Sequence, residues 1–441
     1  MKQLQYKVLG VAFVFLLISS VIPSTASFSE INSKYLDISK EINQTGLINV
    51  DPKITTILDM INESLLHEYL ETLVGYGPRW TGTYSCQKSA EYIFQQFNEM
   101  GLETRYQNWT VFGNKYHPRI YKSQNVEGTL RGNNSTSDKI IAFNAHYDTV
   151  RISPGANDDG SGTAAVLATA YILSHFKFEH TLKFIAFSGE ELDLLGSRTY
   201  AKETYEKNAN ILVDINADMI GHAETAEGGR RMGIRATEDA QWILDIIENL
   251  NTYYNINFQI NTGEIDRDGR GWSDYHSFVE YGYEALACWG GEGDPNMHTP
   301  RDNIDNVNLS YLVNTTRIIA ATIAYLADNY DTYPQVRIVS PKFGKLYFEG
   351  REICDIGDLK TAVINYIWIW TDVKFATVPI ERAEFYYDNL LTYTDTDPPF
   401  KWNFNKLSIR KHRITVVVYD ELGRKSSDWR DIRFINLFKN R

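Results

Sequence analysis

The sequence predicts an α/β fold with a central sheet and helices, followed by an all-β domain of the immunoglobulin-like sandwich type. Between residues 138 and 329, apolar segments of strand length alternate with helical segments, which is typical of an α/β sheet. Residues 181–187 are nearly all apolar, as expected for a central strand covered on both faces. After residue 331 the chain changes to short apolar or alternating runs separated by turns, which indicates a β-sandwich.

The individual elements follow from apolar spacing and from glycine and proline residues that interrupt it. Apolar residues at helical spacing predict one helix over 54–73, and a Gly/Pro-rich loop at 75–85 separates it from a helix at 86–100. The other expected helices are 160–175, 194–207, 237–250, 274–280 and 308–329. The expected strands are 103–112, 119–130, 138–146, 181–187, 210–218, 231–235 and 283–289, with residues 261–272 expected as a loop. The later runs are 336–339, 345–348, 361–370, 382–387, 407–419 and 429–437.

The N-terminal segment indicates export. Two lysines precede an apolar run over residues 8–22, and small residues follow it, which is typical of a secretory signal peptide. An uncleaved N-terminal anchor is the alternative interpretation. We therefore divide the chain into a signal peptide or anchor (1–27), a linker or propeptide (28–55), the α/β domain (56–331) and the Ig-like domain (335–441), and expect a secreted or extracytoplasmic protein.

Charge and cysteine content exclude two classes of function. The net charge of −12 over 441 residues offers no basic patch for a nucleic acid. The three cysteines, Cys86, Cys288 and Cys354, have no spacing typical of a zinc finger. The sequence leaves two alternatives for Cys86 and Cys288, a disulfide between them or isolated buried thiols.

Histidine and carboxylate side chains follow the ends of several expected strands. His146 ends one strand, Asp218 ends another, and Asp158 lies in the glycine-rich loop GANDDGSG. Because the carboxyl ends of parallel strands meet at one edge of an open sheet, we expect these residues to converge. Together with Glu191 and with His298 of the loop MHTPRDNID, they form a ligand set of His, Asp and Glu that suits zinc at a catalytic site.

Two further carboxylates suggest supporting roles. Glu190 is adjacent to Glu191 directly after a buried strand, so one carboxylate can bind metal while its neighbour takes a proton from water. Asp148 lies two residues after His146 on the same face of an extended segment, where it can accept the second ring N–H of the histidine.

The motifs HYD, GANDDGSG, FSGEE, NADMIG and HTPRDNID, in this order, resemble the co-catalytic di-zinc exopeptidases over roughly residues 56–330. This family includes secreted bacterial leucyl aminopeptidases, with glutamate carboxypeptidases and glutaminyl cyclases as relatives. The resemblance implies an eight-stranded mixed sheet and two Zn²⁺ ions. His146 and Asp218 would bind one zinc, Glu191 and His298 the other, and Asp158 would bridge them. It also implies a cis peptide between Asp158 and Asp159.

The resemblance further implies hydrolysis of the N-terminal residue from peptides by an activated water, with Glu190 as general base. Tyr275 is a candidate donor to the oxyanion, and a Tyr packed on a helix face is the alternative. The loop RWTGT, with Arg79, also resembles a family loop, but no role follows for it. The alternative functions are a carboxypeptidase or other amide hydrolase of the same family, a glutaminyl cyclase, or a non-catalytic surface receptor that keeps the fold.

One strand of the Ig-like domain carries an aromatic face. Tyr366, Trp368 and Trp370 alternate with residues of core character, Val363, Ile367 and Ile369. The aromatic face is interpreted as a contact with the α/β domain, as covered core, or as a platform for a glycan or cell surface.

Overall fold

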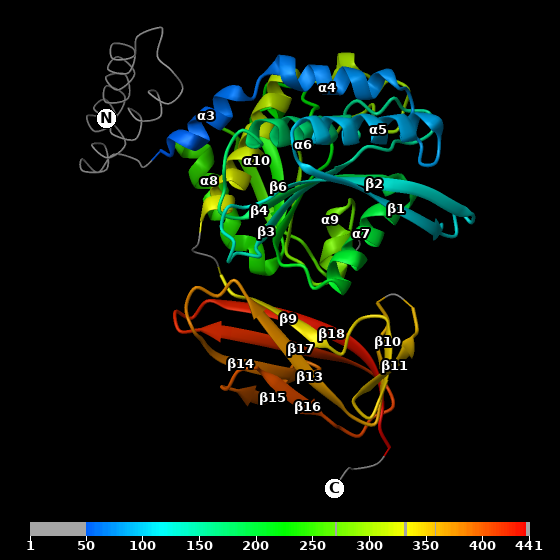
Figure 1. Ribbon diagram of the computed structural model, residues 1–441, viewed down its shortest axis with the longest axis vertical. Coiled ribbons are helices and arrows are strands. Elements are labelled where there is room, and N and C mark those ends of the chain that lie inside the picture. Colours follow the sequence, from blue (N-terminus) through cyan, green and yellow to red (C-terminus); the bar gives the residue numbers. More distant parts are fainter. Residues whose placement is uncertain (1–49, 270, 330–332, 358, 438–441) are drawn as a thin grey trace, which may run out of the picture. The chain divides into compact units, whose positions relative to one another are not determined.

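The computed structural model describes residues 50–269, 271–329, 333–357 and 359–437 (Figure 1). The chain divides into two compact units, with the boundary between Asp59 and Met60. The predicted signal peptide or anchor lies outside the described residues, as does most of the predicted linker. Within the described ranges, none of the helices combines the length and the apolar character needed to cross a membrane.

The predicted helix over 54–73 is wrong in its extent, because two helices occupy this segment. α3 spans Pro52–Met60 and α4 spans Glu63–Gly75. Asn62 adopts an extended backbone and its side chain accepts a hydrogen bond from the backbone N–H of Leu65. This N-cap starts a new helix, so the apolar periodicity continues across a break that it does not reveal.

The predicted mixed sheet of eight strands is confirmed. Its order is β1-β2-β4-β3-β5-β8-β6-β7, with parallel pairing of β3 to both β4 and β5 and of β5 to β8. The strands are β1 (Glu103–Phe112), β2 (Ile120–Leu130), β3 (Ile140–His146), β4 (Thr181–Phe187), β5 (Ile211–Ala217), β6 (Arg231–Ala236), β7 (Gln259–Glu264) and β8 (Ala285–Gly290). β7 replaces part of the loop expected at 261–272. It is an edge strand with mostly exposed side chains, so it lacks the apolar alternation of a covered strand.

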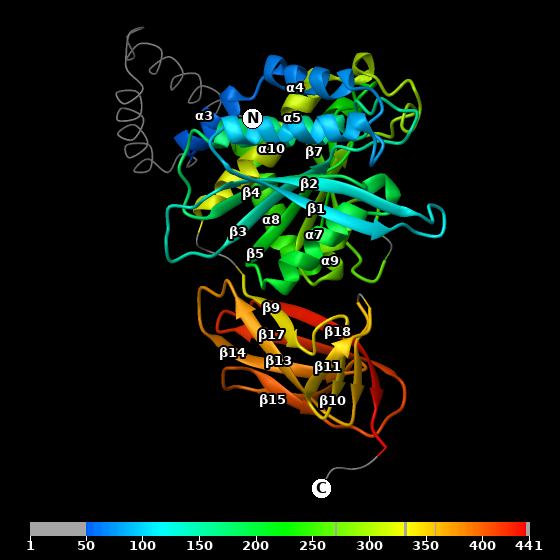
Figure 2. The same cartoon turned by 45° about the vertical axis from the view of Figure 1, so that its right-hand side comes forward.

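Helices cover both faces of this sheet, as Figures 1 and 2 show. α5, α6, α8 and α10 lie with α4 on one side, and α7 and α9 lie on the other. Their bounds are α5 (Tyr84–Glu99), α6 (Gly160–Leu173), α7 (Leu195–Glu206), α8 (Gln241–Tyr253), α9 (Tyr275–Glu280) and α10 (Leu309–Asp328), with short 3₁₀ turns η1 (Glu190–Leu192), η2 (Gly228–Arg230), η3 (Glu238–Ala240) and η4 (Ile304–Asn306). α6 is buried almost throughout, which explains its small and apolar composition.

The C-terminal region is all β, as predicted, and contains two sheets. One has the order β11-β10-β12-β18-β17-β14-β15 and the other β16-β13-β9. The strands are β9 (Gln335–Ser340), β10 (Lys345–Phe348), β11 (Arg351–Asp355), β12 (Ala362–Ile364), β13 (Ile367–Lys374), β14 (Ile380–Tyr387), β15 (Leu390–Asp395), β16 (Lys401–Phe404), β17 (Lys411–Asp420) and β18 (Lys425–Ile435). The Ig-like assignment stays a prediction, and the parallel pairs β10–β12 and β12–β18 depart from an antiparallel sandwich.

The two faces of β13 differ as its sequence indicates. Ile367 and Ile369 are buried in the core between the two sheets. Trp368 and Trp370 are 39% and 36% exposed, so this face is neither covered core nor closed by the rest of the chain that the structure describes. The Lys401 ammonium lies 5.9 Å and 4.8 Å from the two ring centroids. Binding of a glycan or cell surface by this face stays a prediction. Cys86 and Cys288 are buried free thiols, so no disulfide joins them.

Candidate metal centre

The ends of three neighbouring strands bring the predicted ligands to one edge of the sheet. His146 is the last residue of β3, Asp218 directly follows β5, and Glu190 and Glu191 open η1 after β4. Because β3 is parallel to both β4 and β5, these carboxyl ends lie side by side.

The side chains form two clusters of potential ligands that share one carboxylate. In the first, Nε2 of His146 lies 3.3 Å from Oδ1 of Asp158 and 3.7 Å from Oδ1 of Asp218. In the second, Nε2 of His298 lies 3.0 Å from Oδ2 of Asp158 and 3.3 Å from Oε2 of Glu191. Within each cluster, one ligand atom from each residue lies within 4.8 Å of the others, and Asp158 presents one oxygen to each.

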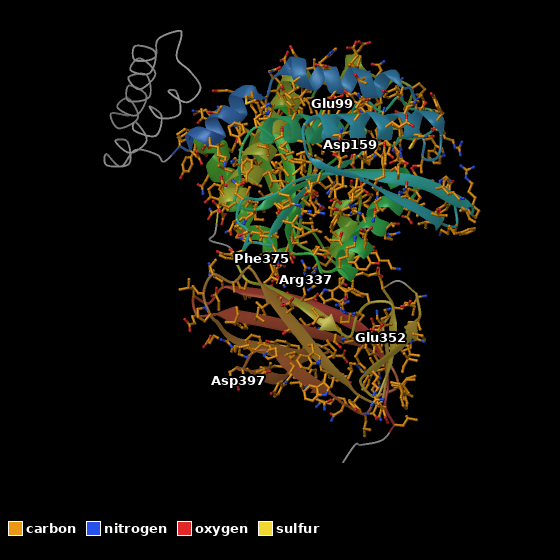
Figure 3. The ribbon with its side chains drawn as sticks, in the orientation of Figure 1. Glu99, Asp159, Arg337, Glu352, Phe375 and Asp397 are labelled. Carbon is orange, nitrogen blue, oxygen red and sulfur yellow. The ribbon has the colours of Figure 1, made fainter. Side chains whose placement is uncertain are left out.

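The loop that carries Asp158 is fixed by carboxylates that sequence reasoning did not assign. The Asp158–Asp159 peptide is cis, as the resemblance implies. Asp159 (labelled in Figure 3) caps α6 and accepts hydrogen bonds from the backbone N–H groups of His146, Gly162 and Met219. Asp302 accepts from the backbone N–H groups of Asn157 and Asp158 at 2.7 and 3.1 Å. Both residues stand in motifs visible in the sequence, DDGSG and HTPRD, but nothing in the spacing marks them as loop supports.

A tight turn sets the two adjacent glutamates apart. Gly189 has φ +84°, and a Cβ there would lie 2.9 Å from the Trp109 ring, so the turn requires glycine. Glu191 points into the second cluster, where Oε1 also accepts a hydrogen bond from the backbone N–H of Val150. Oε2 of Glu190 lies 3.9 Å from Nε2 of His146 and belongs to neither cluster of ligands. Glu191 is thus placed among the candidate ligands, and Glu190 lies beside them.

Asp148 contacts His146 differently from the prediction. The nearer partner of the His146 Nδ1 is the backbone carbonyl of Asp148, at 3.0 Å, while the carboxylate oxygen Oδ1 is 3.7 Å away. The carboxylate instead accepts hydrogen bonds from the Thr81 hydroxyl at 2.7 Å and from the backbone N–H of Glu190 at 3.2 Å. The Asp148 carbonyl thus lies closer to the imidazole than the Asp148 carboxylate does, and the same residue contacts the imidazole and supports the glutamate turn.

The charge balance of the centre is strongly negative. Burial acts to lower the pKa of His146, but the charge of Glu190 and the contacts with Asp158 and Asp218 outweigh it and raise the pKa well above its usual value. Hydrogen bonds to Asp158 and Glu191 raise the pKa of His298 to about 10. Burial raises the pKa of Glu190 well above its usual value, and nearby carboxylates add to this. Several carboxylates thus lie close to two imidazoles that can bind metal in their neutral form. A divalent cation bound here would compensate the negative charge of the carboxylates.

Unsatisfied polar atoms also fit a metal. Among the described residues, Nε2 of His146 and Oδ1 of Asp218 are buried without a hydrogen-bond partner. Buried polar atoms are normally paired, and a divalent cation bound between these two atoms would give both of them a partner. Imidazole and carboxylate donors without a thiolate suit zinc at a catalytic site.

Tyr275 is not brought into either cluster. Its ring packs in an apolar cluster with Ile265 and Val279, and its hydroxyl accepts a 3.4 Å hydrogen bond from the backbone N–H of Trp272. Burial raises its pKa, and the charge of Asp218 adds to this effect. The role of oxyanion donor stays a prediction. The preceding Asp274, which sequence reasoning left without a role, is fully buried, and burial raises its pKa to about 7.

Comparison with known proteins gives a consistent family. Residues 125–323 match peptidase family M28. The chain is 29% identical over 229 residues to aminopeptidase Y of Saccharomyces cerevisiae, covering 48% of this chain and 41% of that protein. It is 32% identical over 208 residues to aminopeptidase YwaD of Bacillus subtilis, covering 46% and 44%. The solved aminopeptidase from Aneurinibacillus sp. strain AM-1 superimposes with a TM-score of 0.54 at 18% identity, over 62% of this chain and 96% of that one.

The sheet, the paired ligand clusters and these matches define an exopeptidase-like fold with a candidate site for zinc. The match of residues 125–323 to peptidase family M28, together with the two aminopeptidase relatives, confirms the predicted resemblance. It spans less than half the length of the two curated relatives, both of which are aminopeptidases.

Proposed function

We propose that this protein is a secreted zinc aminopeptidase that removes the N-terminal residue from peptides. The observation that carries the proposal is the pair of ligand clusters joined by Asp158, with Glu190 beside them. The two relatives described above are aminopeptidases, which favours a free N-terminus over a C-terminus as the recognised end. Export rests on the N-terminal segment of the sequence.

His146, Asp158 and Asp218 would hold one zinc, and Asp158, Glu191 and His298 the other. The ions would supply Lewis-acid activation of water and of the scissile carbonyl. Glu190 takes the proton from the attacking water and passes it to the leaving amine, because its carboxylate borders the ligands without being one of them. The contact between the Asp148 carbonyl and Nδ1 of His146 holds Nε2 toward Asp158 and Asp218.

The test compares peptide-bond substrates with blocked and free amines. Purified protein is assayed on aminoacyl-chromophore substrates and their N-acetylated counterparts, first after chelation and again after zinc is restored. We expect cleavage of the free-amine series alone, lost on chelation and recovered with zinc. Glu190→Gln should lower kcat at least about 10²-fold while zinc content stays unchanged. Glu206→Gln, which removes an exposed glutamate of α7, is the matched control and should keep full activity.

The alternatives give different outcomes in the same experiment. If a protein that holds zinc cleaves none of the free-amine substrates, the aminopeptidase proposal is contradicted. Carboxypeptidase substrates, other amides and N-terminal glutamine cyclisation would then be tested. If the protein neither cleaves these substrates nor binds metal, the enzyme hypothesis is contradicted, and a non-catalytic receptor that keeps the fold is favoured.

A further inference from the structure

Arg79 is a fully buried cation whose role is not explained by the proposed chemistry. The residue is 0% exposed, and its guanidinium donates only to backbone carbonyls. Nε donates to the Tyr147 carbonyl at 2.7 Å, Nη1 to the Pro154 carbonyl at 2.6 Å, and Nη2 to the Gly155 carbonyl at 2.8 Å. Within the described part of the chain, no carboxylate accepts a hydrogen bond from this group.

The carbonyls of Tyr147, Pro154 and Gly155 belong to the two segments that carry the candidate ligands His146 and Asp158, while a fourth acceptor, the Leu73 carbonyl at 3.4 Å from Nη1, lies in α4. Tyr147 stands between His146 and Asp148 at the end of β3. Pro154 and Gly155 belong to the loop that leads to Asp158. One planar side chain therefore joins the strand end to the loop, and its fork of donors fixes direction as well as distance.

Two neighbouring features tighten the same junction. The hydroxyl of Thr149 accepts a hydrogen bond from the Arg79 backbone N–H at 2.9 Å and reaches the Ser153 carbonyl at 3.1 Å. Gly155 has φ +63°, and a Cβ there would lie 2.2 Å from Cγ2 of Thr149 and 2.5 Å from the Asp158 carbonyl oxygen. The Gly155 carbonyl also accepts from the backbone N–H of Gly160, the first residue of α6. The loop is thus held on both sides of Asp158.

Physical cost argues against a merely passive role. A buried guanidinium loses its hydration, and an apolar side chain of similar size would fill the same space without that cost. What an apolar side chain cannot do is hold three carbonyls at set positions. A displacement of a few tenths of an ångström at Asp158 would change both clusters at once, because its two oxygens face different histidines.

We propose that Arg79 is a positioning residue for the metal centre, which sets the separation between His146 and Asp158 by joining the end of β3 to the loop at 154–155. The inference rests on the proposed function, because it presumes that the two clusters bind metal. Arg79 acts through these segments and contacts no substrate.

The test measures metal binding by the full chain without using peptide turnover. Zinc affinity of Arg79→Lys is determined by competition with a chromophoric chelator, and the visible absorption of the Co²⁺-substituted protein reports ligand geometry. Lysine keeps the charge and most of the stem but not the planar fork. We expect zinc affinity to fall about 10- to 100-fold, the range found for residues that orient metal ligands, and the Co²⁺ spectrum to change. Thr149→Val, a smaller change at the same junction, should shift both in the same direction.

Glu127→Gln is the matched control. Glu127 is another buried charged residue of the same sheet, and it has no hydrogen bond to residues 146–158. The Glu127→Gln substitution should lower the unfolding temperature while zinc affinity and the Co²⁺ spectrum stay as in the wild type. If Arg79→Lys and Thr149→Val also lower only the unfolding temperature and leave zinc affinity and the Co²⁺ spectrum unchanged, Arg79 contributes only to the stability of the fold and the proposal is overturned. Zinc binding by the wild-type protein is measured first, so that this result counts against the role of Arg79 and not against the proposed function.

Discussion

Glu127 offers the sharpest test of how a buried charge contributes to this fold. Its carboxylate on β2 is 5% exposed and accepts hydrogen bonds from Arg105 at 2.6 and 2.9 Å and from Lys183 at 2.7 Å. The hydroxyls of Tyr200 and Thr129 complete the set at 2.8 and 2.9 Å. Burial acts to raise the pKa of Glu127, but Lys183 and Arg105 outweigh it and lower the pKa from 4.5 to about 2.

The expected magnitude follows from this pKa. A fall from 4.5 to about 2, at about 1.36 kcal/mol per pH unit, corresponds to about 3 kcal/mol of stability at pH 7. Since the folded-state pKa is lowered, the contribution is complete above pH 4.5 and is lost as the pH falls toward 2. At pH 3, less than half of it should remain. Glu127→Gln should therefore destabilise the protein by about 3 kcal/mol at neutral pH and by progressively less in acid.

The assay is urea unfolding of wild type and Glu127→Gln between pH 7 and pH 3. Glu91→Gln serves as control, because Glu91 pairs with Lys88 at the surface, where solvent screens the interaction, and little change is expected. A difference that stays constant across this pH range would refute the reasoning, since it would show that lost packing and not lost charge causes the destabilisation.

Three further changes test separate parts of the molecule. His298→Ala should reduce bound zinc from two ions to one per chain after dialysis, measured by atomic absorption; a variant that keeps two would exclude His298 as a ligand. Phe385→Ala removes a fully buried ring from the C-terminal core and should cost about 3–5 kcal/mol in unfolding free energy, whereas a loss below about 1 kcal/mol would mean that this core is loosely packed. Trp368→Ala with Trp370→Ala should weaken binding to immobilised oligosaccharides at least tenfold and leave peptide hydrolysis unchanged; equal binding would remove the glycan interpretation.

Much of the α/β region could be predicted because its central strands are covered on both faces. β4 matches its expected bounds of 181–187, because an apolar run between polar turns marks both ends of a buried strand. β7 could not be predicted in the same way, because an edge strand with exposed side chains has no apolar pattern. In the C-terminal region, β11 and β15 are likewise largely exposed and lie outside the predicted runs, whereas β17, with every second side chain buried, overlaps the run predicted at 407–419.

The candidate site shows a similar division. Residues at strand ends, such as His146 and Asp218, could be brought together by topology alone. Their supports could not, because a carboxylate that accepts backbone N–H groups, like Asp302, depends on loops whose paths no periodicity describes. The spacing predicts that Asp148 contacts the His146 ring, and it does. The spacing does not predict that the contact is made by the backbone carbonyl and not by the carboxylate.

The shared position of Asp158 has a consequence for how the site fills. If each cluster binds an ion, a carboxylate that offers one oxygen to each would link the two binding events thermodynamically. Whatever the first ion does to the affinity for the second, the second does equally to the first. Occupancy of the two proposed sites would therefore not follow two independent isotherms, and the half-filled protein would be a distinct chemical species whose abundance depends on how much free metal its surroundings supply.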